Sequence, residues 1–97
     1  MASTVEELTV NYSEGDTQLV KELDKVVLSK GAWATLMFRY QDWDAQGGEF
    51  GSEKFSIRRY QKRNGEYFQK SKFNISSVDH ARKIIETLET WIGKPAE

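Results

Sequence analysis

Apolar and polar residues alternate most regularly in "AWATLMFRYQDW", residues 32–43. One side of this run is continuously apolar and consists of Ala34, Leu36, Phe38 and Tyr40. The other side is mixed and consists of Trp33, Thr35, Met37, Arg39 and Gln41. A period of two with one apolar side is typical of a half-buried strand, whereas the Ala, Leu and Met content would also suit a helix. We expect a strand here, preceded by another strand over residues 25–31 and followed by a glycine-rich loop.

The dipeptide Asn64-Gly65 lies between two β-like runs and predicts a hairpin. Asn-Gly suits a two-residue type I′ turn, because both central residues need a positive φ. The turn predicts the cross-strand pairs Arg63 with Glu66, Lys62 with Tyr67, Tyr60 with Gln69 and Arg58 with Ser71. One face of the hairpin would carry Arg58, Tyr60, Lys62, Tyr67, Gln69 and Phe73. The other face would carry Phe55, Ile57, Arg59, Phe68, Lys70 and Lys72.

The last part of the chain predicts a helix. Ser76 or Ser77 can cap its start, and Gly93 and Pro95 can end it. A stripe at helical spacing consists of Val78, Ala81, Ile85, Leu88 and Ile92, widened by Ile84 and Trp91. This stripe is broad for one helix on a small sheet. We therefore expect Ile84, Ile85, Leu88 and Trp91 to serve both the core and a homodimer.

The start of the chain shows no convincing periodicity. The first fifteen or so residues suggest a mobile tail, with an edge strand over "ELTVNY" as the alternative. "TQLVKELDK", residues 17–25, could form one or two helical turns. We expect an acidic, flexible segment over residues 1–24 and one domain over residues 25–97. The expected order of elements is four strands followed by one helix, which is an α+β fold.

The charge is distributed unevenly along the chain. The 97 residues have a net charge of −1, but residues 1–53 carry four basic side chains against ten acidic ones. Residues 54–83 carry nine basic side chains against Glu66 and Asp79. Local potential matters more at a binding surface than net charge. The basic region is therefore a candidate surface for a polyanion.

Other kinds of chemistry find little support in the sequence. Cysteine is absent, and the one histidine, His80, falls at the expected helix start, where a surface position is usual. No acid–base pair or nucleophile motif is visible, so we expect no enzyme and no cofactor. Asp42 to Glu53 partly fits a calcium-binding loop, but Gln46 and Glu49 depart from its pattern, and we expect no metal. No apolar run predicts a membrane span or a signal peptide.

Basic and aromatic residues alternate in the hairpin region. Lysine and arginine bind phosphates, and unpaired bases stack on flat rings. Paired bases hide their faces, so this combination indicates single-stranded nucleic acid rather than duplex. The candidate residues are Lys30, Trp33, Arg58, Arg59, Tyr60, Lys62, Arg63, Phe68, Lys70 and Lys72. Aromatic residues in strands also commonly belong to the core, which is the competing interpretation.

The stretch "FSIRRYQKRNGEYFQKSKFNIS", residues 55–76, followed by an amphipathic helix, resembles the positive cofactor four family of transcriptional coactivators and its bacterial relatives. The family pattern is I-R-x-Y, a turn ending in G-E, a basic strand closing on K-G-I-x-L, and a helix. The matching residues are Ile57, Arg58, Tyr60, Gly65, Glu66, Lys72 and Ile75, with Lys30 and Trp33 upstream. Phe73-Asn74 replaces the glycine of K-G-I, and Gln61 stands where an aromatic residue can follow I-R-x-Y.

The resemblance implies a Whirly-like ββββα fold, a four-stranded curved antiparallel sheet followed by one helix. It also implies a homodimer that forms through the helices. It also implies binding of single-stranded DNA with little sequence preference, in transcription regulation or DNA maintenance, with the transcription machinery as a candidate partner. The location would be the bacterial cytoplasm or nucleoid, or the nucleus of a eukaryote. Lys30, Arg58, Lys62, Lys70 and Lys72 would contact phosphates, and Trp33, Tyr60 and Phe68 would stack on bases. A protein-interaction module and an RNA-binding domain are the alternatives.

Overall fold

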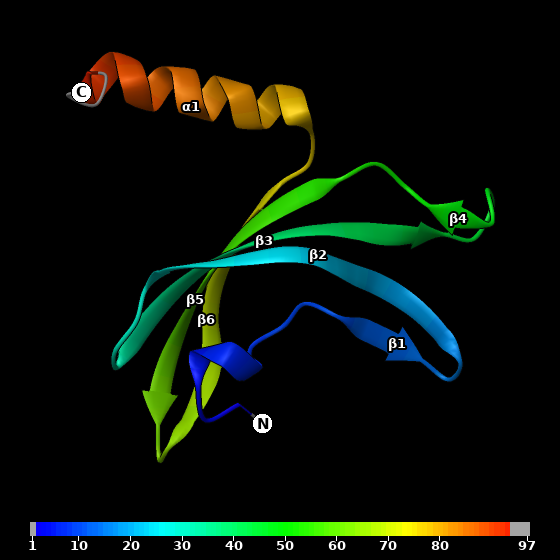
Figure 1. Cartoon of the computed structure of the whole chain (residues 1–97), viewed down its shortest axis with the longest axis horizontal. Coiled ribbons are helices and arrows are strands. Elements are labelled where there is room, and N and C mark those ends of the chain that lie inside the picture. The colour runs from blue at the N-terminus through cyan, green and yellow to red at the C-terminus, as the bar shows by residue number, and fades with distance from the viewer. Residues whose placement is uncertain (1, 94–97) are drawn as a thin grey trace.

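A curled antiparallel sheet followed by a C-terminal helix forms the architecture, which is α+β as expected (Figure 1). The computed structural model describes residues 2–93. Its elements are η1 (Val5–Glu7), β1 (Tyr12–Glu14), β2 (Thr17–Ser29), β3 (Trp33–Asp44), β4 (Glu49–Phe50), β5 (Lys54–Arg63), β6 (Glu66–Ile75) and α1 (Val78–Ile92). The strand order is β1-β2-β3-β5-β6, and the short β4 pairs with β3. The sheet therefore has six strands rather than the expected four.

The central strand β3 confirms the alternation in the sequence. Leu36 and Phe38 are fully buried, and Ala34 and Tyr40 lie on the same side. The competing helix is wrong, because a helix would spread these residues around its circumference. β2 and β5 pair with the two edges of β3.

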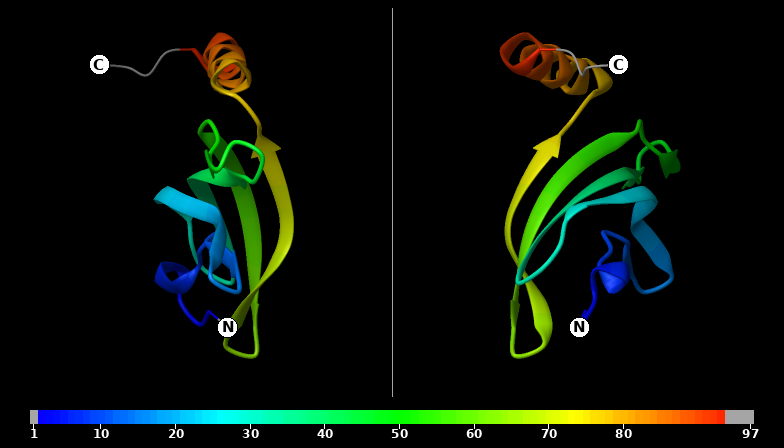
Figure 2. Two further views of the ribbon diagram at one scale, coloured as in Figure 1. Left: turned by 90° about the vertical axis from the view of Figure 1, so that its right-hand side faces the viewer. Right: turned by 60° about the vertical axis from the view of Figure 1, so that its left-hand side comes forward.

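The N-terminal segment, residues 2–10, lies inside the curl and completes the core (Figure 2). Val5, Leu8 and Val10 are buried against the apolar side of β3. The Lys25 ammonium holds the segment by donating to the carbonyl oxygens of Val5, Glu6 and Leu8, at 3.2, 2.9 and 2.8 Å. At the start of the segment, the Tyr67 amide donates to the Ala2 carbonyl oxygen at 2.8 Å.

This packing moves the domain boundary toward the N-terminus. The expected boundary at residue 25 falls within β2, and the expected helical turns over residues 17–25 are strand. A single sheet with one apolar face needs a second layer to cover that face. Residues 2–10 supply this layer with only three buried apolar side chains, too few to produce a recognisable period in the sequence.

The β5–β6 hairpin turns at Asn64-Gly65, where φ is 53° and 79°, as the type I′ turn requires. Three of the predicted pairs are confirmed: Arg63 with Glu66, Lys62 with Tyr67 and Tyr60 with Gln69. The fourth is wrong, because a β-bulge lies between Arg59 and Tyr60 in the register. Arg58 pairs with Lys72 and Arg59 pairs with Ser71, so Lys70 is the extra residue. Beyond the bulge, Lys72 and Phe73 therefore lie on the faces opposite to those expected.

Helix α1 begins and ends as the sequence predicts. Its N-cap is Ser77, whose hydroxyl accepts from the His80 amide at 3.1 Å, and its C-cap is Gly93, with φ of 79°. Pro95 lies outside the described residues. The helix stands away from the sheet in all views (Figures 1 and 2). No α1 side chain is buried, and Trp91 and Ile92 are 77% and 80% exposed.

The N-terminal layer makes a stability prediction. We expect Leu8→Ala to lower the free energy of unfolding by about 2–4 kcal/mol, because it empties a site in the core. Leu8 is 7% exposed, whereas Leu28 on β2 is 53% exposed and offers a matched control. Leu28→Ala should cost less than about 1 kcal/mol. Chemical denaturation of both variants measures the difference, and equal stabilities would show that residues 2–10 are not part of the core.

Candidate nucleic-acid interface

The two faces of the sheet differ in what covers them. The inner face is the side of β3 that bears Leu36 and Phe38, and residues 2–10 cover it. The outer face is the opposite side, which bears Trp33, Thr35 and Met37 on β3. The register carries the outer face onto β5 through Arg59 and Gln61, and onto β6 through Phe68 and Phe73.

The structure divides the candidate residues between these faces. The outer face carries Trp33, Arg59, Arg63 and Phe68. The inner side of the strands carries Arg58, Tyr60, Lys62 and Lys72. Lys30 lies in the turn between β2 and β3, and Lys70 lies at the bulge. The candidates therefore do not form one continuous surface, contrary to the simplest interpretation of the sequence.

A row of exposed rings crosses the outer face. Trp33 pairs with Gln61 across β3 and β5, and Gln61 pairs with Phe68 across β5 and β6. The side chains of Trp33 and Phe68 are 42% and 38% exposed. The Arg59 guanidinium lies 4.6 Å from the centre of the Trp33 ring, within the range of a cation–π contact. Arg59 is exposed and forms no salt bridge among residues 2–93.

Tyr60 and Arg58 belong to the core side instead. Tyr60 is 5% exposed, so its ring is not available to a base in this structure. The Arg58 guanidinium donates to Ser56 Oγ and to Gln69 Oε1, both at 3.2 Å, and lies over the Phe38 ring. The expected stacking role of Tyr60 is therefore corrected to packing, and Arg58 is held by neighbouring side chains.

Burial also changes the acidity of Tyr60. Desolvation is the main effect that raises the pKa of its phenol above the ordinary value of 10.0, and nearby Arg58 partly opposes it. Desolvation likewise raises the pKa of Tyr40 on the same face. Burial on the inner face is therefore the largest cause of both shifts.

Two features of the surface were not found from the sequence. Gln61 lies between Trp33 and Phe68 in the register, so a polar side chain separates the two rings. Phe73 is 51% exposed and continues a second outer row from Met37 and Ile57. The bulge at Lys70 brings Phe73 to this face, and no residue type in the sequence signals a bulge there.

The loop that partly fits a calcium site is held by ion pairs and turn hydrogen bonds. Asp42 forms a salt bridge with Lys54 at 2.9 Å, and this hydrogen bond raises the pKa of Lys54 above its ordinary value. Asp44 accepts from the amides of Gln46 and Gly47. Residues 2–93 contain no group of three or more side chains placed to hold a metal ion. Within that range, no helix has the length and apolarity to cross a membrane.

Comparison with known proteins gives no relative for the chain. No family model matches its sequence, and neither a curated protein nor a solved structure matches it. The geometry of the two faces and the motif residues themselves are therefore what indicates a function.

The buried tyrosines predict a pH dependence. A raised folded-state pKa means that the folded chain holds the phenol proton more tightly than the unfolded chain. The contribution of this phenol to the free energy of unfolding is then fully present below the ordinary tyrosine pKa of 10.0. It is lost as the pH rises through the folded-state pKa. We expect Tyr60→Phe to reduce the decrease in the free energy of unfolding at alkaline pH. Denaturation of both proteins across the alkaline range measures it, and parallel losses would contradict the effect.

Proposed function

We propose that the chain is a binding protein for single-stranded nucleic acid, with single-stranded DNA as the ligand and little sequence preference. The observation that supports this most directly is the outer row, in which two exposed rings flank Gln61 and the Arg59 guanidinium lies over one of them. Basic side chains at the hairpin end add attraction for a phosphate backbone.

The contact between Arg59 and Trp33 suggests how a base is accepted. Before binding, the guanidinium occupies one face of the indole. A base that takes this position gains stacking of about 1–3 kcal/mol. Arg59 is then released to bind a phosphate, so its cation–π contact is exchanged for a charge-assisted hydrogen bond. Phe68 offers a second ring to the same strand.

The arrangement favours single strands over duplex. Rings on a sheet contact base faces, which are hidden within a duplex. Arg63 and Lys70 lie near the ring row and carry charge without reading base edges. The expected preference is therefore for unpaired DNA of mixed sequence, as in transcription regulation or DNA maintenance; the resemblance to coactivators is the support for these settings.

We further propose that the chain acts as a homodimer through α1. Its apolar stripe is exposed at Ile85, Leu88, Trp91 and Ile92, while Ile84 is half-buried. A contiguous exposed apolar stripe of this kind marks an interaction site. The same stripe on a second copy would cover it, and two sheets would then present two outer rows to one strand.

A protein-interaction module is the second candidate. The row of Met37, Ile57 and Phe73 adds apolar surface to the outer face, and Phe73 is half-exposed. Apolar surface of this kind suits a protein partner as well as a base. The oligonucleotide measurement below separates the two functions.

The first test is a titration of labelled single-stranded DNA, single-stranded RNA and duplex oligonucleotides at two salt concentrations. We expect the single-stranded DNA to bind most tightly. Its binding affinity should decrease by about 0.7 decades per decade of salt concentration for each phosphate neutralised. Trp33→Ala and Phe68→Ala should each weaken binding by about 5- to 100-fold, the equivalent of one lost stack.

Tyr12→Ala supplies the matched control, because Tyr12 is an exposed aromatic residue on β1, outside the outer row. It should bind like the unaltered protein. Absence of binding to every oligonucleotide would reject the proposal and favour the protein-interaction module. Tighter binding of RNA than of DNA would reassign the ligand.

Sedimentation tests the homodimer. At micromolar concentration we expect a dimer, and Leu88→Asp should convert it to a monomer, because a charge in an apolar interface loses its hydration. Arg82→Asp on α1 is a matched control that should remain dimeric. A monomer for the unaltered protein would contradict this part of the proposal.

A further inference from the structure

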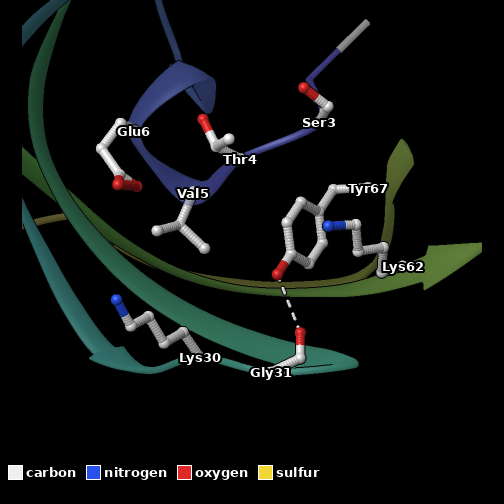
Figure 3. Close-up of a pocket in the computed structure, with 8 residues that line it drawn as sticks. All are labelled: Ser3, Thr4, Val5, Glu6, Lys30, Gly31, Lys62 and Tyr67. Atoms are coloured by element: carbon white, nitrogen blue, oxygen red, sulfur yellow. Dashed lines mark hydrogen bonds between the residues drawn. The ribbon is translucent and has the colours of Figure 1, made fainter. Parts of the chain in front are cut away.

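A pocket of about 530 Å³ opens where the N-terminal segment meets the ends of two hairpins (Figure 3). The segment contributes Ser3, Thr4, Val5 and Glu6, and the strand ends contribute Lys30, Gly31, Lys62 and Tyr67. Its size falls in the range of sites for small ligands. The pocket is held together by a hydrogen bond of 2.8 Å from the Tyr67 hydroxyl to the Gly31 carbonyl oxygen.

Two lysines and one glutamate, Glu6, are the charged residues that line this pocket. Lys30 and Lys62 lie on opposite sides of it, with Val5 between them (Figure 3). Neither lysine forms a salt bridge in the described part of the chain, where the two ion pairs are Arg39–Glu53 and Lys54–Asp42. Lys62 Nζ lies 5.4 Å from the centre of the Tyr67 ring, which keeps the amine beside the pocket.

The remaining polar groups of the pocket are already engaged. The hydroxyls of Ser3 and Thr4 both donate to Glu7 Oε1, at 2.9 and 3.1 Å. The Tyr67 hydroxyl donates to Gly31. The groups left to meet a ligand are therefore the two ammonium groups, the apolar surfaces of Val5 and Tyr67, and the carboxylate of Glu6. Two ammonium groups beside apolar surface suit the phosphates and sugars of a nucleic-acid backbone.

We propose that this pocket binds two successive phosphates of a nucleic-acid strand, one at Lys30 and one at Lys62. The inference rests on the proposed function, which it deepens. Trp33 follows Lys30 by three residues, and Lys62 follows Gln61 directly, so the pocket and the ring row share one end of the sheet. A strand whose bases stack on the outer face would pass its backbone over this end and into the pocket.

Removing the charge of Glu6 should raise the binding affinity, whereas removing a lysine charge should lower it. Glu6 is the one carboxylate among the pocket residues, it is exposed, and it opposes a phosphate. Its backbone carbonyl, which bonds Lys25, is unchanged in Glu6→Gln. We expect Glu6→Gln to tighten binding by about two- to threefold at low salt, whereas the two lysine substitutions weaken it.

The experiment measures the affinity of a labelled oligothymidylate against salt for Lys30→Gln, Lys62→Gln and the double variant. Each single variant should bind about three- to fivefold more weakly at low salt. In each single variant, the decrease of log affinity with log salt should also become less steep by about 0.7, because one phosphate is no longer neutralised. Lys21→Gln, on β2 away from the pocket, is the matched control and should keep both values.

A second measurement separates this proposal from the proposed function. Tripolyphosphate, which carries successive phosphates but no base, is titrated while the amide signals of Gly31 and Tyr67 are followed by NMR. Shifts that saturate in the unaltered protein and vanish in the double variant would support the pocket even if no oligonucleotide bound. Absence of shifts would overturn the proposal that the pocket binds phosphates. The same holds if the double variant keeps the salt slope of the unaltered protein while Trp33→Ala still binds DNA more weakly, and that result would leave the role of the ring row intact.

Discussion

The structure depends on the packing of residues 2–10 into the curl of the sheet. β2, β3, β5 and β6 form a single layer, and one layer cannot bury an apolar face by itself. Val5, Leu8 and Val10 supply the missing layer over Leu36 and Phe38. The Lys25 ammonium ties the segment down by donating to three of its carbonyl oxygens.

This one interaction also decides which surfaces are left for a ligand. With the inner face filled, Tyr60 and Arg58 become packing residues although the sequence places them among basic and aromatic neighbours. The outer face keeps Trp33, Arg59 and Phe68 accessible. The N-terminal segment then forms one wall of the pocket beside Lys30 and Lys62. The acidic start of the chain therefore contributes to the core and also bounds the basic end of the sheet.

Local patterns predicted much of the fold. The alternation in β3, the turn at Asn64-Gly65 and the cap at Ser77 each depend on a few neighbouring residues, and each is found as expected. The role of residues 2–10 could not be predicted, because long-range burial decides it and the segment has no period of its own. The candidate site was predicted as a set of residue types, but its division between faces depends on register. Register beyond Lys70 follows from an extra residue that no sequence pattern signals.

The bulge at Lys70 has a wider consequence for the C-terminal part of the chain. Because side chains alternate along a strand, one additional residue reverses the direction of every side chain after it. If Lys70 were paired in a regular ladder instead of bulged, Phe73 would face inward and Lys72 outward, which would exchange an apolar outer face for a more basic one. The surface chemistry at the end of β6 therefore depends on whether the strand keeps its bulge, while the core sequence of β3 stays the same.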